Sequence, residues 1–509
     1  MKSLVSQMRI GLASLCLALG MVTQAQAPLD VRVALVIGNS AYAGPAALTN
    51  PANDARAMAG ALRTMGFDVI EVRDATRTSL LQGIETMQQK LQGRQGAAVL
   101  YYAGHGLQLD WRNYMVPVDA RITAAADVPV QTVPIDAVIE AFKKAQTRLN
   151  IVVLDACRDN PFASSGSAKG LAQLDAPPNT VLAYATAPGS VAEDGTAASG
   201  NGLYTGFLLQ EIVKPVKIED VFKRVRLEVR KGSNGRQIPW ESTSLEDDFA
   251  FNTTGKVVTM PKLGDTQRQE AFALEKADWD RIKDSSNPRE FIDFLIKFPS
   301  GTIGELAQSR LDRLQRPTVV ATPGQGAEVQ LPGGDRFQLG DAYSFISKDG
   351  LTGVETSRFN WTVSRVAGEL AEFNGGERAY TMGGGVIKDP NGQYDPPWTG
   401  LPGSDYQVGK QWTSRSNLTQ TDGQTGWVEV QSRIRSREQV TVPAGTFDTY
   451  KIETTMRDQW GRTSKLTYWN QPAFGISVKL TFERRNRNGQ IITSTVRELT
   501  SRLRHGARA

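Results

Sequence analysis

The first half of the chain alternates apolar runs with stretches whose apolar residues recur every three or four positions. The runs predict buried strands at residues 31–37, 67–72, 97–102, 149–154 and 180–184. The helical spacing predicts helices near residues 51–65, 80–91 and 135–145. The first of these begins at Asn50-Pro51, where we expect asparagine to cap the helix. Strands that alternate with helices predict an α/β layered domain with a mostly parallel sheet, over residues 28–255.

The pattern changes beyond this domain. Helical spacing at residues 265–315 predicts a small helical hairpin module, and the Pro- and Gly-rich residues 316–334 predict a linker. Residues 335–502 alternate apolar and polar positions between Gly, Asn and Asp turns, one of them DPNG. They predict an antiparallel β domain, curled into a barrel or half-barrel. Arg433, Arg435 and Arg437 alternate on one predicted strand, so they share one of its faces. This face is either solvated or a site for an anionic ligand.

The N-terminus has the pattern of a secretion signal. Lys2 and Arg9 precede a short apolar run, and small residues follow it, so we expect residues 1–27 to be removed on export to the periplasm or the medium. Cleavage after Ala25 is the alternative, because a cut after Ala27 would leave proline next. The net charge of +5 falls to +3 without these two residues, too little to argue for a nucleic-acid partner.

Removal of this segment leaves a single cysteine, Cys157, and two histidines, His105 and His505. Cys157 follows one predicted core strand and His105 follows another. Side chains beyond the carboxyl ends of neighbouring parallel strands meet at one edge of the sheet, where an imidazole can deprotonate a thiol. The backbone N–H groups of Gly106 and Cys157 could then hold an oxyanion. The alternatives are a small buried cysteine and a structural, hydrogen-bonded histidine.

The segments YYAGHG and DACRDNP, which carry His105 and Cys157, resemble the caspase–metacaspase clan of cysteine peptidases, and a similar spacing belongs to a known caspase signature. The segment YATAPGSVAED, at residues 184–194, resembles the part of caspases that lines the substrate groove. The resemblance covers residues 31–251. It implies a sheet of about six strands between helical layers, and cleavage of peptide bonds through an acyl-enzyme. In the β domain, VPAGTFDTYKIE and YWNQPAFGISVKL weakly resemble half-barrel domains that handle periplasmic lipoproteins.

The differences from caspases concern the primary pocket. Asp194, beside Glu193, stands where the resemblance places a caspase arginine, while Asp54 and Asp155 resemble the pocket aspartates of metacaspases. Carboxylates bind long cationic side chains, so we expect cleavage after Arg or Lys. The alternatives are a first-turn helix acid for Asp54, a backbone-orienting acid for Asp155 and a solvent-exposed acid for Asp194. The polar loop after Cys157 contains Lys169, either a self-cleavage site or part of an uncut loop.

Two classes of function remain. The first is a cysteine endopeptidase acting on peptide or protein substrates, with C-terminal modules that bind substrate or a cell-envelope partner. The second is a non-catalytic sensing or binding protein whose β domain carries the function. No metal-ligand spacing or cofactor motif is present in the sequence, so we expect no cofactor. Some metacaspases require calcium, at scattered acids that a sequence does not reveal.

Overall fold

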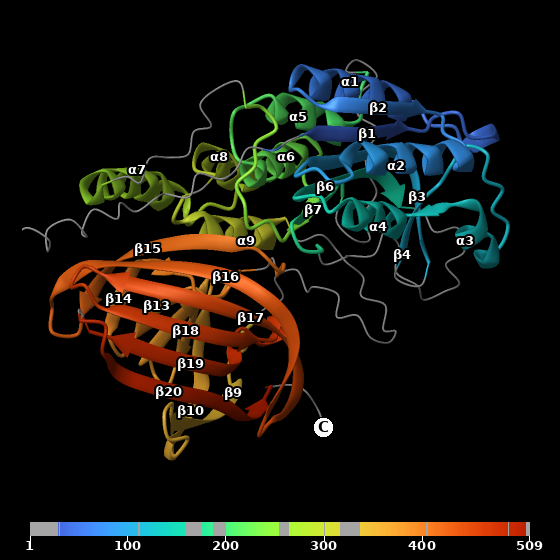
Figure 1. Cartoon of the computed structure of the whole chain (residues 1–509). Helices are drawn as coiled ribbons and strands as arrows, with labels where there is room; N and C mark the ends of the chain where they lie inside the picture. Colours follow the sequence, from blue (N-terminus) through green and yellow to red (C-terminus); the bar gives the residue numbers. More distant parts are fainter. Residues whose placement is uncertain are drawn as a thin grey trace, which may run out of the picture.

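The computed structural model describes residues 29, 31–109, 112–158, 176–186, 200–253, 264–299, 301–315, 336–403, 406–486 and 488–504. They form an α/β domain, three helices beside it and a β barrel (Figure 1). The expected secretion signal lies outside these residues. In the part of the chain so described, no helix is both long enough and apolar enough to cross a membrane.

The α/β domain is built on one twisted sheet with the strand order β2-β1-β3-β6-β7-β8. The first five strands are parallel, and β8 runs antiparallel to β7 at the edge. Their bounds are β1 (Arg32–Gly38), β2 (Asp68–Arg73), β3 (Ala97–Leu109), β6 (Leu149–Arg158), β7 (Thr180–Tyr184) and β8 (Trp240–Thr243). All five strands predicted in this half of the chain are therefore confirmed. Two short antiparallel strands, β4 (Arg112–Met115) and β5 (Val133–Pro134), continue from the end of β3.

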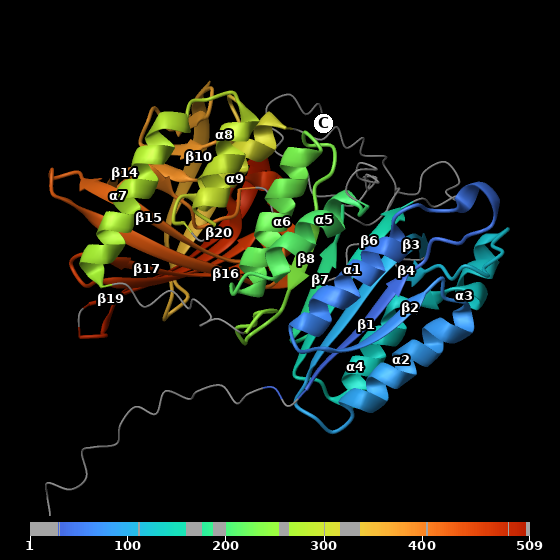
Figure 2. The same ribbon diagram turned by 90° about the horizontal axis from the view of Figure 1, so that it is seen from above.

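Helices cover both faces of the sheet (Figure 2). One face packs under α1 (Pro51–Thr64), α5 (Leu203–Ile212) and α6 (Ile218–Gly232), and the other under α2 (Arg77–Leu91) and α4 (Ile135–Ala145). The shorter helical turns are η1 (Gly44–Ala46), η2 (Ala125–Asp127) and α3 (Val128–Gln131). Because helices bury both faces, successive residues of the central strands are apolar in an unbroken run, which is what the sequence pattern indicated.

The start of α1 differs in one detail from the prediction. The side chain of Asn50 makes no capping hydrogen bond, and its backbone is already helical. The Ser40 hydroxyl, from the loop after β1, instead accepts a hydrogen bond from the N–H of Ala52 at 3.0 Å. A free N–H of a first helical turn needs an acceptor of some kind, and here the neighbouring loop supplies it.

Three helices form the predicted helical module: α7 (Asp265–Ile282), α8 (Pro288–Lys297) and α9 (Gly304–Leu314). Their aromatic and aliphatic side chains pack together with Leu227 of α6. Arg230 of α6 is 1% exposed and extends all three guanidinium nitrogens towards α9. It pairs with Asp312 at 2.5 Å, donates to the carbonyl of Leu311 at 3.3 Å and bonds the side chain of Gln315. The module is thus a continuation of the α/β domain's packing.

This buried contact gives a stability prediction. We expect Arg230→Ala to lower the free energy of unfolding by about 3–5 kcal/mol, because it removes the buried cation of the pair with Asp312 together with its bonds to Leu311 and Gln315. The control is Lys231→Ala on the same helix, whose pair with Asp293 is largely exposed and contributes at most about 1 kcal/mol. Urea denaturation followed by tryptophan fluorescence measures both variants. Equal losses in the two would contradict a structural role for the Arg230 contact.

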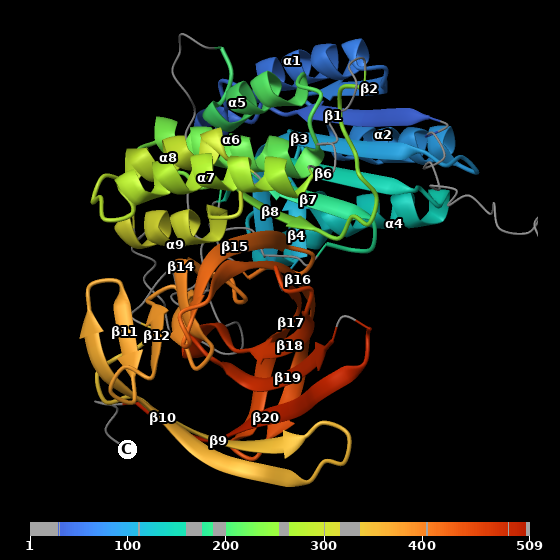
Figure 3. The ribbon, with the colours of Figure 1, turned by 90° about the vertical axis from the view of Figure 1, so that its left-hand side faces the viewer.

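The C-terminal domain is a closed antiparallel barrel of twelve strands (Figure 3). The strands are β9 (Ala342–Asp349), β10 (Glu355–Ala367), β11 (Leu370–Phe373), β12 (Arg378–Thr381), β13 (Val386–Asp389), β14 (Gly392–Trp398), β15 (Gln411–Gln420), β16 (Thr425–Val442), β17 (Gly445–Asp458), β18 (Thr463–Asn470), β19 (Ser477–Arg485) and β20 (Ile491–Leu503). A 3₁₀ turn, η3 (Pro472–Phe474), joins β18 to β19.

The antiparallel β domain is confirmed, and its sheet closes because β20 pairs with β9. The barrel alternative therefore replaces the half-barrel. The DPNG turn joins β13 to β14 as expected. A bulge near Arg435 interrupts the alternation of the three arginines in β16. Arg435 pairs with Glu453 and Arg437 with Asp448 on exposed surface, so these two form a solvated, ion-paired face.

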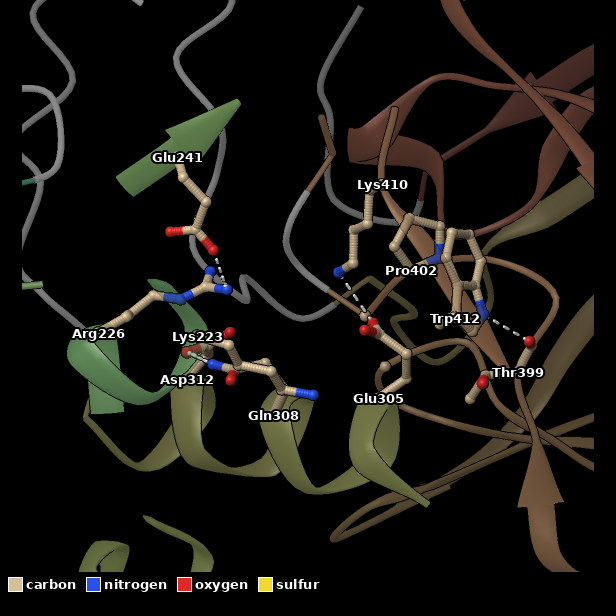
Figure 4. A network of polar contacts seen from close by, with 12 residues as sticks. Lys223, Arg226, Glu241, Glu305, Gln308, Asp312, Thr399, Pro402, Lys410 and Trp412 are labelled. Carbon is tan, nitrogen blue, oxygen red and sulfur yellow. Dashed lines mark hydrogen bonds and ion pairs between the residues drawn. The ribbon is translucent and has the colours of Figure 1, made fainter. Parts of the chain in front are cut away.

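Helix α9 lies between the α/β domain and the barrel (Figure 4). On the α/β side, Arg226 of α6 pairs with Glu241 of β8 at 2.6 Å. On the barrel side, Glu305 of α9 forms an ion pair with Lys410 at 3.0 Å. The barrel also approaches β8 directly, since a Cβ on Gly409 would overlap the carbonyl oxygen of Thr243. The three parts of the chain are therefore docked through specific polar contacts.

Candidate active site

Gly104 and His105 lie inside β3 and not beyond its end as predicted, and two tyrosines hold the backbone there. Gly104 has a φ of +151°, and a Cβ there would lie 2.8 Å from the hydroxyl of Tyr42 and 3.0 Å from that of Tyr102. A side chain fits neither the dihedral angle nor the space. Tyr42 accepts a hydrogen bond from the N–H of His105 at 3.0 Å, and Tyr102 donates to the carbonyl of His105 at 2.6 Å. The backbone of His105 is thus fixed on both sides.

The imidazole of His105 has a defined orientation. Its ring lies 4.4 Å from the ring of Tyr42, and its Nε2 lies 2.7 Å from the carbonyl oxygen of Ala46, in η1. Because a carbonyl oxygen only accepts hydrogen bonds, this contact places the hydrogen on Nε2. In the neutral ring the lone pair is then on Nδ1, the nitrogen that can take a proton.

Cys157 lies level with His105 in the neighbouring strand. The parallel register of β3 and β6 pairs Ala103 with Asp155, His105 with Cys157 and Gly106 with Arg158. Adjacent strands in a sheet are about 4.8 Å apart, so the backbones of the two predicted catalytic residues are immediate neighbours. The side chain of Cys157 is outside the described part of the structure. Gly106 also pairs with Met115 of β4, so its backbone lies between two strands.

The two predicted pocket acids converge on Gly202, at the start of α5. Asp54 is buried, and its Oδ1 accepts a hydrogen bond from the N–H of Gly202 at 3.0 Å. A Cβ on Gly202 would lie 3.3 Å from Oδ2 of Asp54 and 3.7 Å from Oδ2 of Asp155. Two carboxylates from α1 and β6, about a hundred residues apart in sequence, therefore approach the same point. Asp54 also lies in the first turn of α1, which is the position that the alternative role as a helix-stabilising acid requires.

A chain of hydroxyl groups supports Asp155. Thr205 donates to its Oδ2 at 2.6 Å, so the Thr205 oxygen accepts from Tyr101, whose hydroxyl is 2.5 Å away. Burial, and after it the negative charges of Asp155 and Asp54, raise the pKa of Tyr101 well above its usual value. Burial and the charge of Asp155 do the same to the pKa of Tyr204. These tyrosines therefore stay neutral, and they contribute hydroxyl groups and no charge to the pocket.

Several residues of this site have no signal in the sequence. Tyr42, Ala46, Gly202 and Thr205 lie in a loop, a 3₁₀ turn and a helix whose positions depend on tertiary packing. The carbonyl of Ala46 acts through its backbone, which no residue type reveals. The predicted site residue Asp194, its neighbour Glu193 and the loop residue Lys169 are outside the described residues.

A cavity of about 1000 Å³ lies elsewhere, where α6, β8, α9 and the barrel meet. Among the residues that the structure describes, none of the predicted peptidase-site residues lines it, whereas Arg433 and Arg435 do. Most of its charged side chains pair with each other, among them Lys217 with Asp248 and Lys410 with Glu305. Such mutual pairing is expected of a wet interface between modules. Over the described ranges, no group of three or more His, Cys, Asp or Glu residues could hold a metal ion.

Two comparisons relate the chain to known proteins. Residues 31–250 match the family model of the caspase domain, Peptidase_C14. The mouse protein "Mucosa-associated lymphoid tissue lymphoma translocation protein 1 homolog" is 29% identical over 225 residues, which are 43% of this chain and 26% of the relative. The human protein "Mucosa-associated lymphoid tissue lymphoma translocation protein 1" matches with the same identity and the same coverage. The chain thus spans about a quarter of the length of these relatives.

Proposed function

We propose that the caspase-family domain at residues 31–250 works as a cysteine endopeptidase in which Cys157 is the nucleophile and His105 the general base. The observation that carries the proposal is the pairing of His105 with Cys157 in adjacent strands, with Nε2 of the imidazole held by the Ala46 carbonyl. A histidine in this tautomer has one basic nitrogen to offer, on the side not bonded to Ala46. If His105 were only structural, its Nδ1 would not need to be available to a substrate or a thiol.

In this mechanism the Cys157 thiol gives its proton to Nδ1 of His105, and the thiolate sulfur attacks the carbonyl carbon of the scissile peptide. The oxygen of the tetrahedral intermediate carries the negative charge, and we assign its stabilisation to the N–H groups of Gly106 and Cys157. The imidazolium returns the proton to the leaving nitrogen as the C–N bond breaks. Water, deprotonated by the same imidazole, then hydrolyses the thioester and frees Cys157.

We further propose that the residue before the scissile bond is Arg or Lys. The support is the pair of carboxylates of Asp54 and Asp155 that flank Gly202. The hydroxyl groups of Tyr101 and Thr205 orient one of these carboxylates, and the hydroxyl groups carry no charge that would compete with a cationic substrate. A guanidinium or ammonium group between two carboxylates gains charge-assisted hydrogen bonds that a neutral side chain does not.

A labelling experiment tests both parts of the proposal. A peptidyl chloromethyl ketone with arginine next to the reactive carbon is expected to alkylate the full chain once, at Cys157, and to lower its peptidase activity in parallel. The matched control is the same reagent with aspartate in place of arginine, which should react much more slowly. Peptide mapping by mass spectrometry identifies the site. Alkylation at Cys16 only, in a chain that retains its signal segment, or faster reaction of the aspartyl reagent, would contradict the proposal.

A further inference from the structure

The barrel is wider than its own side chains need. A closed barrel of about eight strands has an interior that side chains just fill, and the interior grows with strand number. This barrel has twelve strands. Inside it lies a cavity of about 140 Å³. One part of its lining is apolar and aromatic, with Tyr394, Met456, Leu466 and Phe482 among the residues, and the rest is polar, with the charged residues Asp389, Asp458, Arg462 and Arg484. The interior therefore has room for a small ligand.

A cationic side chain lies next to this cavity. Arg497 of β20 pairs in register with Leu480 of β19, and Leu480 pairs with Tyr468 of β18. Two residues along the same strands, Phe482 and Leu466 line the cavity. Side chains two residues apart in a strand are on the same face and about 7 Å apart. Arg497 therefore belongs to the inner face, close to the apolar cavity.

The guanidinium of Arg497 lies between two aromatic rings. Its Cζ is 4.5 Å from the ring centre of Trp361 and 4.8 Å from that of Phe345. One nitrogen, Nη2, donates to the hydroxyl of Ser477 at 2.9 Å, while Nε is buried without a hydrogen-bond partner. Burial lowers the pKa of Arg497 to about 10, so it still carries its charge at neutral pH. The rings orient the cation but do not neutralise it.

No carboxylate neutralises this charge either, among the residues that the structure describes. The groups that act on Arg497 electrostatically are Tyr380, Tyr468 and another arginine, Arg378. Two acids line the cavity, and both are engaged. Asp389 accepts hydrogen bonds from the hydroxyl of Tyr394 at 3.2 Å and the N–H of Asn391 at 2.8 Å, and Asp458 pairs with Arg462 at 2.6 Å. The side chain of Arg497 is partly buried, and a charge in such a place without a carboxylate partner is costly to the folded state. An anion bound at this place would supply the missing partner.

We propose that the barrel interior binds an amphipathic anion, with a carboxylate or phosphate group against Arg497 and an apolar tail in the neighbouring cavity. The guanidinium presents the unbonded Nε–H, together with donors on the terminal nitrogens, in the fork that suits either oxyanion. The hydroxyl groups of Tyr380 and Tyr468 face the same charge. The apolar part of the cavity lining, with Trp398, Leu466 and Phe482, offers a place for the ligand's tail. This site is separate from the proposed peptidase site and does not depend on it.

Isothermal titration calorimetry of the full chain tests the proposal with three probes that share an eight-carbon tail: octanoate, octyl phosphate and octan-1-ol. We expect saturable binding of one anion per chain and at least about tenfold weaker binding of the alcohol, which lacks the charge. Tighter binding of octanoate would identify a fatty-acid type of ligand, and tighter binding of octyl phosphate a phosphorylated one. Absence of binding of both anions up to 10 mM, about the weakest affinity such a site could usefully have, would overturn the proposal.

Variants locate the site. Arg497→Gln should weaken binding of the better anion about 10- to 100-fold, the range for one lost charge-assisted contact. The matched control is Arg435→Gln, on the exposed face of the same barrel, which should bind like the wild type. Arg497→Met should raise the thermal midpoint of the ligand-free chain, because a partly buried charge without a carboxylate partner is removed, and should lose the stabilisation by ligand. Equal anion affinity in the wild type and Arg497→Gln would overturn the site, whatever the peptidase activity of either chain.

Discussion

Replacement of Cys157 by alanine is expected to abolish hydrolysis of arginyl and lysyl peptide amides by the full chain and to leave its fold unchanged. Without the thiol no acyl-enzyme forms, and the chain has no other cysteine beyond Cys16 in the N-terminal apolar segment. His105→Ala is expected to lower kcat by about 10²–10⁴, the usual contribution of a general base. Initial rates with fluorogenic amides measure both effects, and circular dichroism checks the fold.

The second histidine of the chain provides the matched control. His505→Ala removes the same side chain near the C-terminus and should keep full activity. A further expectation separates a base from a structural residue: the remaining activity of His105→Ala should rise steeply with pH, because the thiolate then forms without a base. Full activity in Cys157→Ala, or equal losses in the two histidine variants, would remove the catalytic pair from the proposal and favour the sensing or binding function.

The sequence contains enough information to predict the sheet but not its surroundings. Unbroken apolar runs predicted β1, β3 and β6 because a strand covered on both faces must be apolar throughout. The level pairing of His105 with Cys157 then follows from the similar lengths of β3 and β6 beyond their shared start, Ala97 beside Leu149. Convergence of side chains at the carboxyl edge of a parallel sheet is a property of the fold, so it could be anticipated without coordinates.

Other features depend on contacts between distant segments. Gly202 comes between Asp54 and Asp155 only because α5 packs beside α1, and no local pattern encodes that neighbour. Closure of the barrel depends on the pairing of its first strand with its last. The alternation of apolar and polar residues along these strands would be the same in an open sheet, so it does not predict closure. From the sequence, Arg230 is expected on the surface of an amphipathic helix, but in the structure α9 covers it. In each case, a partner more than eighty residues away decides the role.

The acidic pocket gives the last prediction, which concerns substrate preference. We expect Asp54→Asn to reduce the preference for arginine over norleucine before the scissile bond by about 10²-fold in kcat/KM. Loss of one partner of a buried charge pair costs about 2–5 kcal/mol, and each 1.4 kcal/mol is tenfold. Because the carboxylate of Asp155 remains in the variant, we expect a loss near the lower end of this energy range. Asparagine still has the oxygen that accepts from the N–H of Gly202, so the local structure should persist.

The control addresses the alternative that Asp54 only stabilises its helix. Asp136 occupies the first turn of α4 as Asp54 does in α1, but its side chain is half exposed, paired with Arg112 at 3.5 Å. Asp136→Asn therefore removes a first-turn acid of the same kind without touching the pocket, and the ratio of arginyl to norleucyl hydrolysis should stay as in the wild type. Asp54 is a cleaner target than Asp155, which precedes Cys157 by two residues and shares its strand. If Asp54→Asn keeps the full preference for arginine, or if the wild type cleaves after aspartate, the acidic pocket is excluded and only the catalytic pair remains.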